Sequence, residues 1–98
     1  MSLRELARVF KALGDENRLR ILARLKDATY GVCDLARSVG IAQPTLSHHL
    51  KILRETGLVH AEKEGQWIYC SLNTKAFERL GLDLVGLLER HEEGVASE

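Results

Sequence analysis

Several features are scarce in this sequence, and each shortage excludes a class of protein. Two cysteines in 98 residues do not make the disulfide framework of a small secreted domain, and they favour free thiols in a reducing compartment. No apolar run approaches the roughly 18 residues of a membrane-spanning helix, and the N-terminus lacks the apolar core of a signal peptide. We therefore expect a cytoplasmic protein. One proline and a hydrophobic content of 45% favour a folded, mostly helical chain over a disordered one.

Net charge is also absent, because 14 Lys and Arg balance 14 Asp and Glu. The balance is uneven along the chain: residues 1–63 hold 11 basic and 7 acidic residues, whereas residues 64–98 hold 3 and 7. The excess of basic residues in the first two thirds favours an anionic partner, although many ordinary soluble domains show a charge difference of this size between two parts of the chain. The length suits one domain, residues 1–98, that gains stability from a partner subunit.

Apolar side chains recur every three or four residues in five segments, which predicts five helices. The first helix ends at Gly14, and the second follows a cap at Asp15. The short third helix lies between a cap at Asp34 and a stop at Gly40. The fourth runs to about Thr56 and is ended by Gly57, and the last extends from Thr74 to about Glu93. Two runs of strand-forming residues flank "KEGQ" and predict a β-hairpin. This order predicts a mainly α winged helix-turn-helix with a small β-hairpin.

The stretch "QPTLSHHLKIL", from Gln43 to Leu53, carries the most chemical information. Its leucines are spaced i, i+4 and i+7 and form one apolar face, and both histidines lie off that face with the other polar side chains. Amides, hydroxyls and imidazoles form hydrogen bonds with base edges, and cations contact phosphates. The predicted DNA-binding residues are Gln43, Thr45, Ser47, His48, His49, Lys51 and Arg54 on this helix, with Lys63 and Gln66 at the hairpin tip.

Other uses of this polar face fit the sequence less well. Adjacent histidines are a poor metal pair because side chains at i and i+1 diverge on a helix. The sequence contains no nucleophile elbow, zinc-protease motif or phosphate loop, so we predict no enzyme. A solvated polar face stays open, as does a winged-helix module that binds another protein, which the zero net charge favours. For Trp67 and Tyr69 we expect packing rather than stacking on DNA.

The last predicted helix carries a longer apolar stripe than a small monomer needs to cover its core. Because a large apolar patch is rarely left exposed, we expect it to form a dimer interface with the first helix; completion of one monomer's core is the alternative. The predicted interface residues are Leu3, Leu6, Phe10, Phe77, Leu80, Leu84, Leu87, Leu88 and His91. A two-fold dimer implies duplex DNA with an imperfect inverted repeat, its half-sites about one helical turn apart.

Three blocks of the sequence resemble a known family. "GDENRLRIL", "CDLARSVGIAQPTLSHHLKILRETGLV" and "GQWIYCSLN" look like blocks of the ArsR/SmtB family of bacterial metal- and stress-responsive repressors. The similarity runs from about residue 5 to residue 73. The resemblance implies a homodimer built on the first and last helices and a recognition helix at Pro44–Glu55. It also implies a repressor that blocks a promoter until an inducer binds.

Inducer sites of this family are matched only in part. Arsenic-sensing members carry Cys-Val-Cys-Asp-Leu where this chain reads Gly31-Val32-Cys33-Asp34-Leu35, so one of two thiols is retained. Zinc-sensing members carry Asp-x-His near the start of the last helix, where this chain reads Thr74-Lys75-Ala76, so that site looks absent. An Arg common in the wing is Gln66 here.

Cys33 is the residue we expect to carry any switch. It lies just ahead of a predicted helix N-terminus, where free N–H groups favour the thiolate. If the "TYGV" segment lies beside the second hairpin strand, Cys70 comes towards Cys33. We predict that the two bind a thiophilic metal or metalloid as inducer, or form a redox pair, with no obligatory cofactor. A regulator without a metal site, in which the cysteines only pack, stays open.

Overall fold

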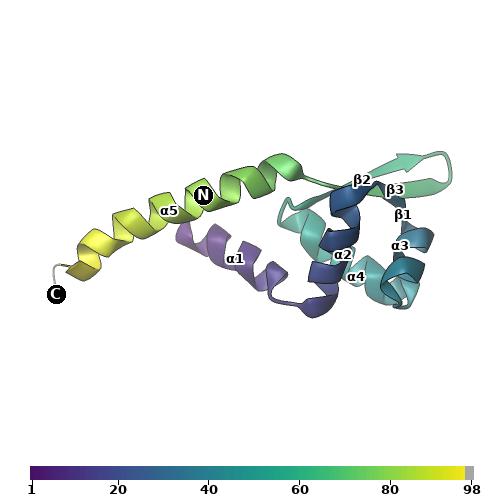
Figure 1. Cartoon of the computed structure of the whole chain (residues 1–98), viewed down its shortest axis with the longest axis horizontal. Helices are drawn as coiled ribbons and strands as arrows, with labels where there is room; N and C mark the ends of the chain where they lie inside the picture. Colours follow the sequence, from purple (N-terminus) through teal and green to yellow (C-terminus); the bar gives the residue numbers. More distant parts are fainter. Residues whose placement is uncertain (97–98) are drawn as a thin grey trace.

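The computed structural model describes the backbone of residues 1–96 and the side chains of residues 1–90 (Figure 1). The elements in chain order are α1 (Leu3–Leu13), α2 (Glu16–Asp27), β1 (Tyr30–Gly31), α3 (Val32–Val39), α4 (Gln43–Glu55), β2 (Val59–Glu64), β3 (Trp67–Leu72) and α5 (Thr74–Ala96). The predicted winged helix-turn-helix is confirmed, and a short strand, β1, is added to the hairpin. The side chain of His91 lies outside the described residues. Within residues 1–96, no helix is both long and apolar enough to span a bilayer.

The helix ends explain most of the predicted boundaries. The Asp15 carboxylate accepts a hydrogen bond of 3.1 Å from the backbone N–H of Arg18 and caps α2 as predicted. Gly57 follows α4 with a φ of 77°, a left-handed conformation that side chains disfavour. The predicted cap at Asp34 is wrong. Helix α3 begins at Val32 without a side-chain cap, and Asp34 lies in its first turn, 3.5 Å from Arg37.

The three strands form one antiparallel sheet in the order β1-β3-β2. Tyr30 lies opposite Cys70 and Gly31 opposite Tyr69, so the segment before α3 does lie beside the second hairpin strand, which was the condition set in the sequence analysis. Because β1 has only two residues, it supports the root of the hairpin and leaves its tip two-stranded. The sheet therefore joins the wing directly to the start of α3.

The core lies where α2, α3 and α4 meet the root of the sheet. Its side chains with the least exposure are Ile21, Leu35, Leu46, Leu53, Leu58 and Cys70. Burial of each leucine contributes about 2 kcal/mol, which fixes α4 on the body of the protein. The expectation that Trp67 packs in this core is wrong, because 55% of its surface is exposed and the buried face of β3 begins only at Cys70.

Candidate nucleic-acid interface

Helix α4 presents a polar outer face on a firmly anchored backbone. Its buried residues include Leu46, Leu50 and Leu53. Its exposed polar side chains include six that were predicted to contact DNA, those of Gln43, Thr45, Ser47, His48, Lys51 and Arg54, and the acidic Glu55 is exposed at the end of the helix. Ala42 offers no side-chain cap, and the first turn contains no acidic residue. The first N–H groups of α4 therefore have no side-chain acceptor at the cap, and the positive end of the helix dipole favours an anion such as phosphate.

His49 is the exception on this helix, and the expectation that it lies on the outer face is wrong. Only 8% of its surface is exposed, and its Nδ1 accepts a hydrogen bond of 3.1 Å from Nε of Arg18 in α2. The same guanidinium donates through its NH1 group to the carbonyl oxygen of Ala12, at 3.4 Å. Arg18 thus connects the end of α1, the start of α2 and the middle of α4. We assign His49 to holding the helix rather than to reading DNA.

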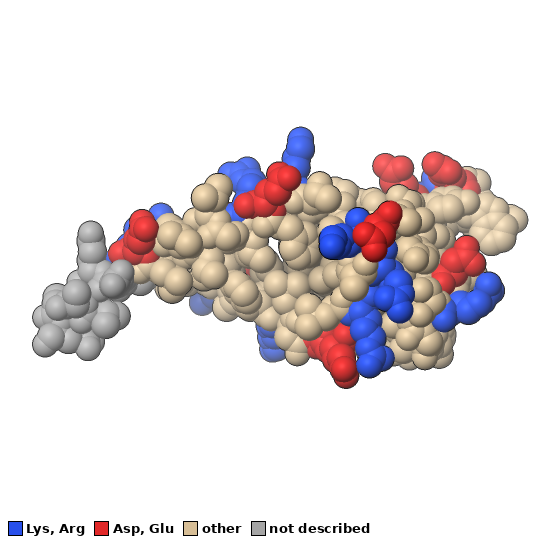
Figure 2. Space-filling model, in the orientation of Figure 1, with Lys and Arg blue, Asp and Glu red and all other residues tan. Residues whose placement is uncertain are grey.

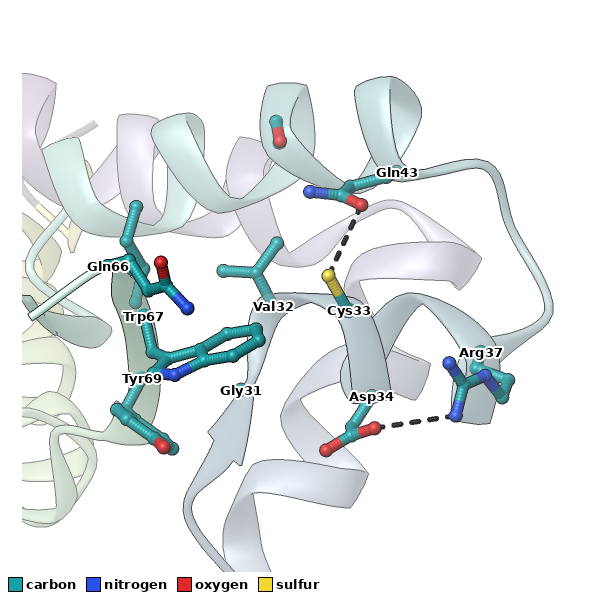
Figure 3. Close-up of a pocket in the computed structure, with 11 residues that line it drawn as sticks. Gly31, Val32, Cys33, Asp34, Arg37, Gln43, Gln66, Trp67 and Tyr69 are labelled. Carbon is teal, nitrogen blue, oxygen red and sulfur yellow. Dashed lines mark hydrogen bonds and ion pairs between the residues drawn. The ribbon is translucent and has the colours of Figure 1, made fainter. Parts of the chain in front are cut away.

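The starts of α3 and α4 are connected by side chains. The Cys33 thiol donates a hydrogen bond to Oε1 of Gln43 across 3.5 Å, so the Gln43 amide lies over the start of α3 (Figure 3). This hydrogen bond restricts the first residue of α4, where side chains of a recognition helix meet the bases.

The hairpin separates its charges between its two faces. Residues directly opposite each other on paired strands share a face, and Lys63 lies opposite Ile68, whereas Glu62 and Glu64 lie opposite Tyr69 and Trp67. Ile68 lines a hollow with Ser47, Lys51 and Arg54 of α4, so Lys63 shares the face that turns towards α4. The two glutamates lie on the other face, and Figure 2 shows carboxylates over the hairpin. Lys63 and the exposed Gln66 at the tip therefore suit contact with the DNA backbone.

The two cysteines occupy different surroundings. Cys33 is exposed, whereas Cys70 has no exposed surface, and burial raises the pKa of its thiol. Burial therefore disfavours the thiolate that metal binding requires. Among the side chains of residues 1–90, no three His, Cys, Asp or Glu side chains converge as a metal site would need. The pair Cys33 and Cys70 does not fit a thiophilic metal ion.

Helices α1 and α5 lie side by side at one end of an elongated molecule that measures 55 × 21 × 19 Å (Figure 1). The structure divides the predicted interface residues into three groups. Leu6 and Leu87 are buried within one chain; Phe77, Leu80 and Leu84 are half-buried; Leu3, Phe10 and Leu88 are exposed.

Two further apolar residues of α5 are exposed and were not among the predicted interface residues. Leu82 and Val85 continue with Leu88 at a spacing of three residues, and 77% of Leu82 is exposed. This second stripe lies beside the predicted one, so α5 is apolar over two faces. The sequence did contain a signal for these two residues, because the apolar surface of the last helix is wider than the single stripe that faces a core.

The fold and this face of α4 define a winged helix-turn-helix protein, and its similarity to known proteins gives its family. The model for "Bacterial regulatory protein, arsR family" matches residues 15–61, from α2 into β2. The transcriptional repressor SdpR of Bacillus subtilis is 40% identical over 70 residues, which cover 71% of this chain and 78% of that protein. The chain belongs to the arsR family of bacterial regulatory proteins, as its resemblance implied.

Two further relatives extend the similarity to nearly the whole chain. An arsenical resistance operon repressor of Staphylococcus xylosus is 34% identical over 96 residues, 98% of this chain and 91% of that protein. A homodimeric winged helix-turn-helix DNA-binding domain of a possible ArsR-family regulator of Mycobacterium bovis, solved by NMR, superposes with a TM-score of 0.74. It is 30% identical and covers 92% of this chain and 85% of that one.

Proposed function

We propose that this protein is a dimeric, sequence-specific DNA-binding repressor of transcription that acts in the cytoplasm. The observation that carries the proposal is the outer face of α4. Gln43, Thr45, Ser47 and His48 are exposed near the helix N-terminus, while the leucines behind them are buried and fix the helix. These side chains supply the donors and acceptors of direct base readout, and Lys51 and Arg54 supply cations for the flanking phosphates.

A dimer follows from the exposed apolar side chains of α1 and α5. Leu82, Val85 and Leu88 on α5 and Leu3 and Phe10 on α1 are all exposed, and a patch of this kind marks an interface in a small protein. The homodimeric relative from Mycobacterium bovis supports the same arrangement. Two copies related by a two-fold axis would present two α4 helices to successive major grooves, with half-sites about 34–36 Å apart.

Repression is supported by the relatives, two of which are named as repressors. For the inducer, we propose that a thiol-reactive agent would act through Cys33, the one exposed thiol, which lies against Gln43 of α4. Titrating the DNA complex with arsenite, cadmium and peroxide tests this. Release that is unchanged in Cys33→Ser would place the inducer site elsewhere.

The function is tested by binding of the purified chain to its own promoter and to random duplex at physiological salt. We expect a clear preference for the promoter. Each of Gln43→Ala, Thr45→Ala and Ser47→Ala removes hydrogen bonds to a base, so each should reduce that preference by about tenfold or more. The matched control changes Lys26 and Asp27 together to Ala, because both are exposed on α2 and their charges cancel.

The rival function, a winged module that binds another protein, predicts a different result. Such a module would show no preference for the promoter, and the α4 substitutions would change nothing in DNA binding. Circular dichroism and molecular mass are measured on every variant. They distinguish the loss of contacts with the bases from unfolding of the chain or dissociation of the dimer.

A further inference from the structure

A groove of about 610 Å³ lies between the wing and the starts of α3 and α4. Its lining comes from four parts of the chain: the end of β1, the first turns of α3, the first turns of α4 and the hairpin from Gln66 to Tyr69 (Figure 3). Because β1 stops at Gly31, no strand within residues 1–96 pairs with the edge of β3 beyond it, and the groove follows that open edge. This volume is in the range of small-molecule sites, about 300–1,000 Å³.

The walls combine apolar surface with a few hydrogen-bonding groups. Val32, Ile68 and the ring of Trp67 form apolar wall, and Trp67 extends towards Val32 across the opening (Figure 3). The amides of Gln43 and Gln66 and the hydroxyl of Ser47 supply donors and acceptors. Trp67 has 55% of its surface exposed, although it is the largest apolar side chain of the protein.

The charges favour an uncharged occupant. The two charged residues that line the groove, Asp34 and Arg37, pair with each other at 3.5 Å and leave no net charge. Trp67 projects from the same face of the hairpin as Glu62 and Glu64, and for neither glutamate does the structure of residues 1–90 show an ion pair. Those carboxylates disfavour a phosphate backbone beside the indole ring, and a duplex offers no unstacked base to place on it.

We propose that this groove binds a planar, uncharged aromatic molecule with hydrogen-bonding groups at its edge. The molecule stacks on Trp67 and contacts the amides of Gln43 and Gln66. Since Gln43 and Ser47 line the groove and also face the DNA bases, an occupied groove competes with operator DNA. This regulatory part rests on the proposed function, whereas binding of the molecule itself does not. The site uses stacking and hydrogen bonds and needs no thiol chemistry.

The probe is 2-naphthol, compared with 2-decalol, which has the same hydroxyl and a saturated ring system without a flat π face. Calorimetry on the full chain without DNA measures binding, and Trp67, the one tryptophan of the sequence, reports it by fluorescence. We expect one saturable site per protomer for 2-naphthol and binding by 2-decalol weakened by about tenfold. Equal binding of the two compounds would overturn the stacking proposal, and no binding of 2-naphthol up to its solubility limit would overturn the site.

Variants locate the site. Trp67→Ala should weaken 2-naphthol binding by about tenfold and Trp67→Phe should restore most of it, because the phenyl ring keeps a stacking face. Leu19→Ala is the matched control, since Leu19 is a similarly exposed apolar residue on α2, outside the groove lining. Unchanged binding in Trp67→Ala would overturn the proposal.

Measurements of promoter binding distinguish the proposed ligand site from the proposed competition between the ligand and DNA. With wild-type chain, saturating 2-naphthol should raise the apparent Kd for the promoter, and an unchanged Kd would overturn the competition. If the chain without ligand shows no promoter preference, the proposed function fails while the ligand result still stands. If Trp67→Ala weakens promoter binding by about tenfold but leaves 2-naphthol binding unchanged, the indole ring contacts DNA and the ligand site is refuted.

Discussion

Removing the Arg18 side chain should destabilise the protein more than removing any exposed arginine. In Arg18→Ala, Nδ1 of His49 loses its donor in a position with 8% exposure, and the carbonyl oxygen of Ala12 loses its hydrogen bond of 3.4 Å. An unsatisfied buried acceptor costs about 1–3 kcal/mol, so we expect a loss of about 2 kcal/mol. For a chain of this length, that lowers Tm by about 8–16 °C.

The assay is thermal unfolding followed by circular dichroism at one fixed protein concentration, because the Tm of a dimer depends on concentration. Arg20→Ala is the matched control. Arg20 lies on the same helix and its pair with Glu16 is exposed, with side-chain exposures of 54% and 83%, so its loss should lower Tm by less than about 4 °C. Equal shifts in the two variants would refute the reasoning. The double variant Arg18→Leu, His49→Phe should regain part of the loss, because the His49 acceptor is removed together with its donor and only the carbonyl oxygen of Ala12 stays without its hydrogen bond.

Three further predictions concern the dimer, the thiols and acid stability. Leu82→Glu should weaken the dimer by at least about 100-fold and give a folded monomer in sedimentation, whereas Leu19→Glu should leave the mass unchanged; a dimer of unchanged strength would exclude Leu82 from the interface. Iodoacetamide should alkylate Cys33 in the native protein and reach Cys70 only on unfolding, as read by mass spectrometry, because burial raises the pKa of the Cys70 thiol. The backbone hydrogen bond from Arg18 lowers the pKa of Asp15 below its ordinary value of 3.8, so its stabilisation is full above that pH and is lost as the pH falls through the lowered pKa. Asp15→Asn should keep the cap and flatten the acid limb of a stability curve; an acid limb as steep as the wild type's would show that other groups cause it.

The parts of the fold that follow local rules were predictable from the sequence. The leucine spacing of α4, the Asp15 cap and the glycine after Thr56 each specify a helix or its end through interactions within a few residues. The start of α3 was missed because Val32 begins the helix without a capping side chain, so Asp34 was the nearest cap in the sequence.

The candidate site was predictable where the exposure of a side chain follows the helical period. It was not predictable where residues distant in the sequence determine whether a side chain is buried. His49 lies off the leucine stripe by spacing, yet it is buried because Arg18, 31 residues earlier, supplies its hydrogen bond. Trp67 alternates with apolar neighbours as a core residue would, yet it is exposed because it lies on the hairpin face of Glu62 and Glu64, which does not turn towards α4. Both outcomes depend on tertiary contacts that the local pattern does not contain.

The division of charge across the hairpin has a consequence for the kinetics of DNA association. A duplex that approaches from the α4 side meets Lys63 first, whereas one that approaches from the back meets Glu62 and Glu64. At physiological salt such fields act over about 8 Å, so they influence only the last step of an encounter. The hairpin would then shorten the lifetime of encounters in which the face with Glu62 and Glu64, rather than α4, meets the DNA. Because this discrimination comes from charge, raising the salt concentration should erode it, and with it the share of collisions that become specific complexes.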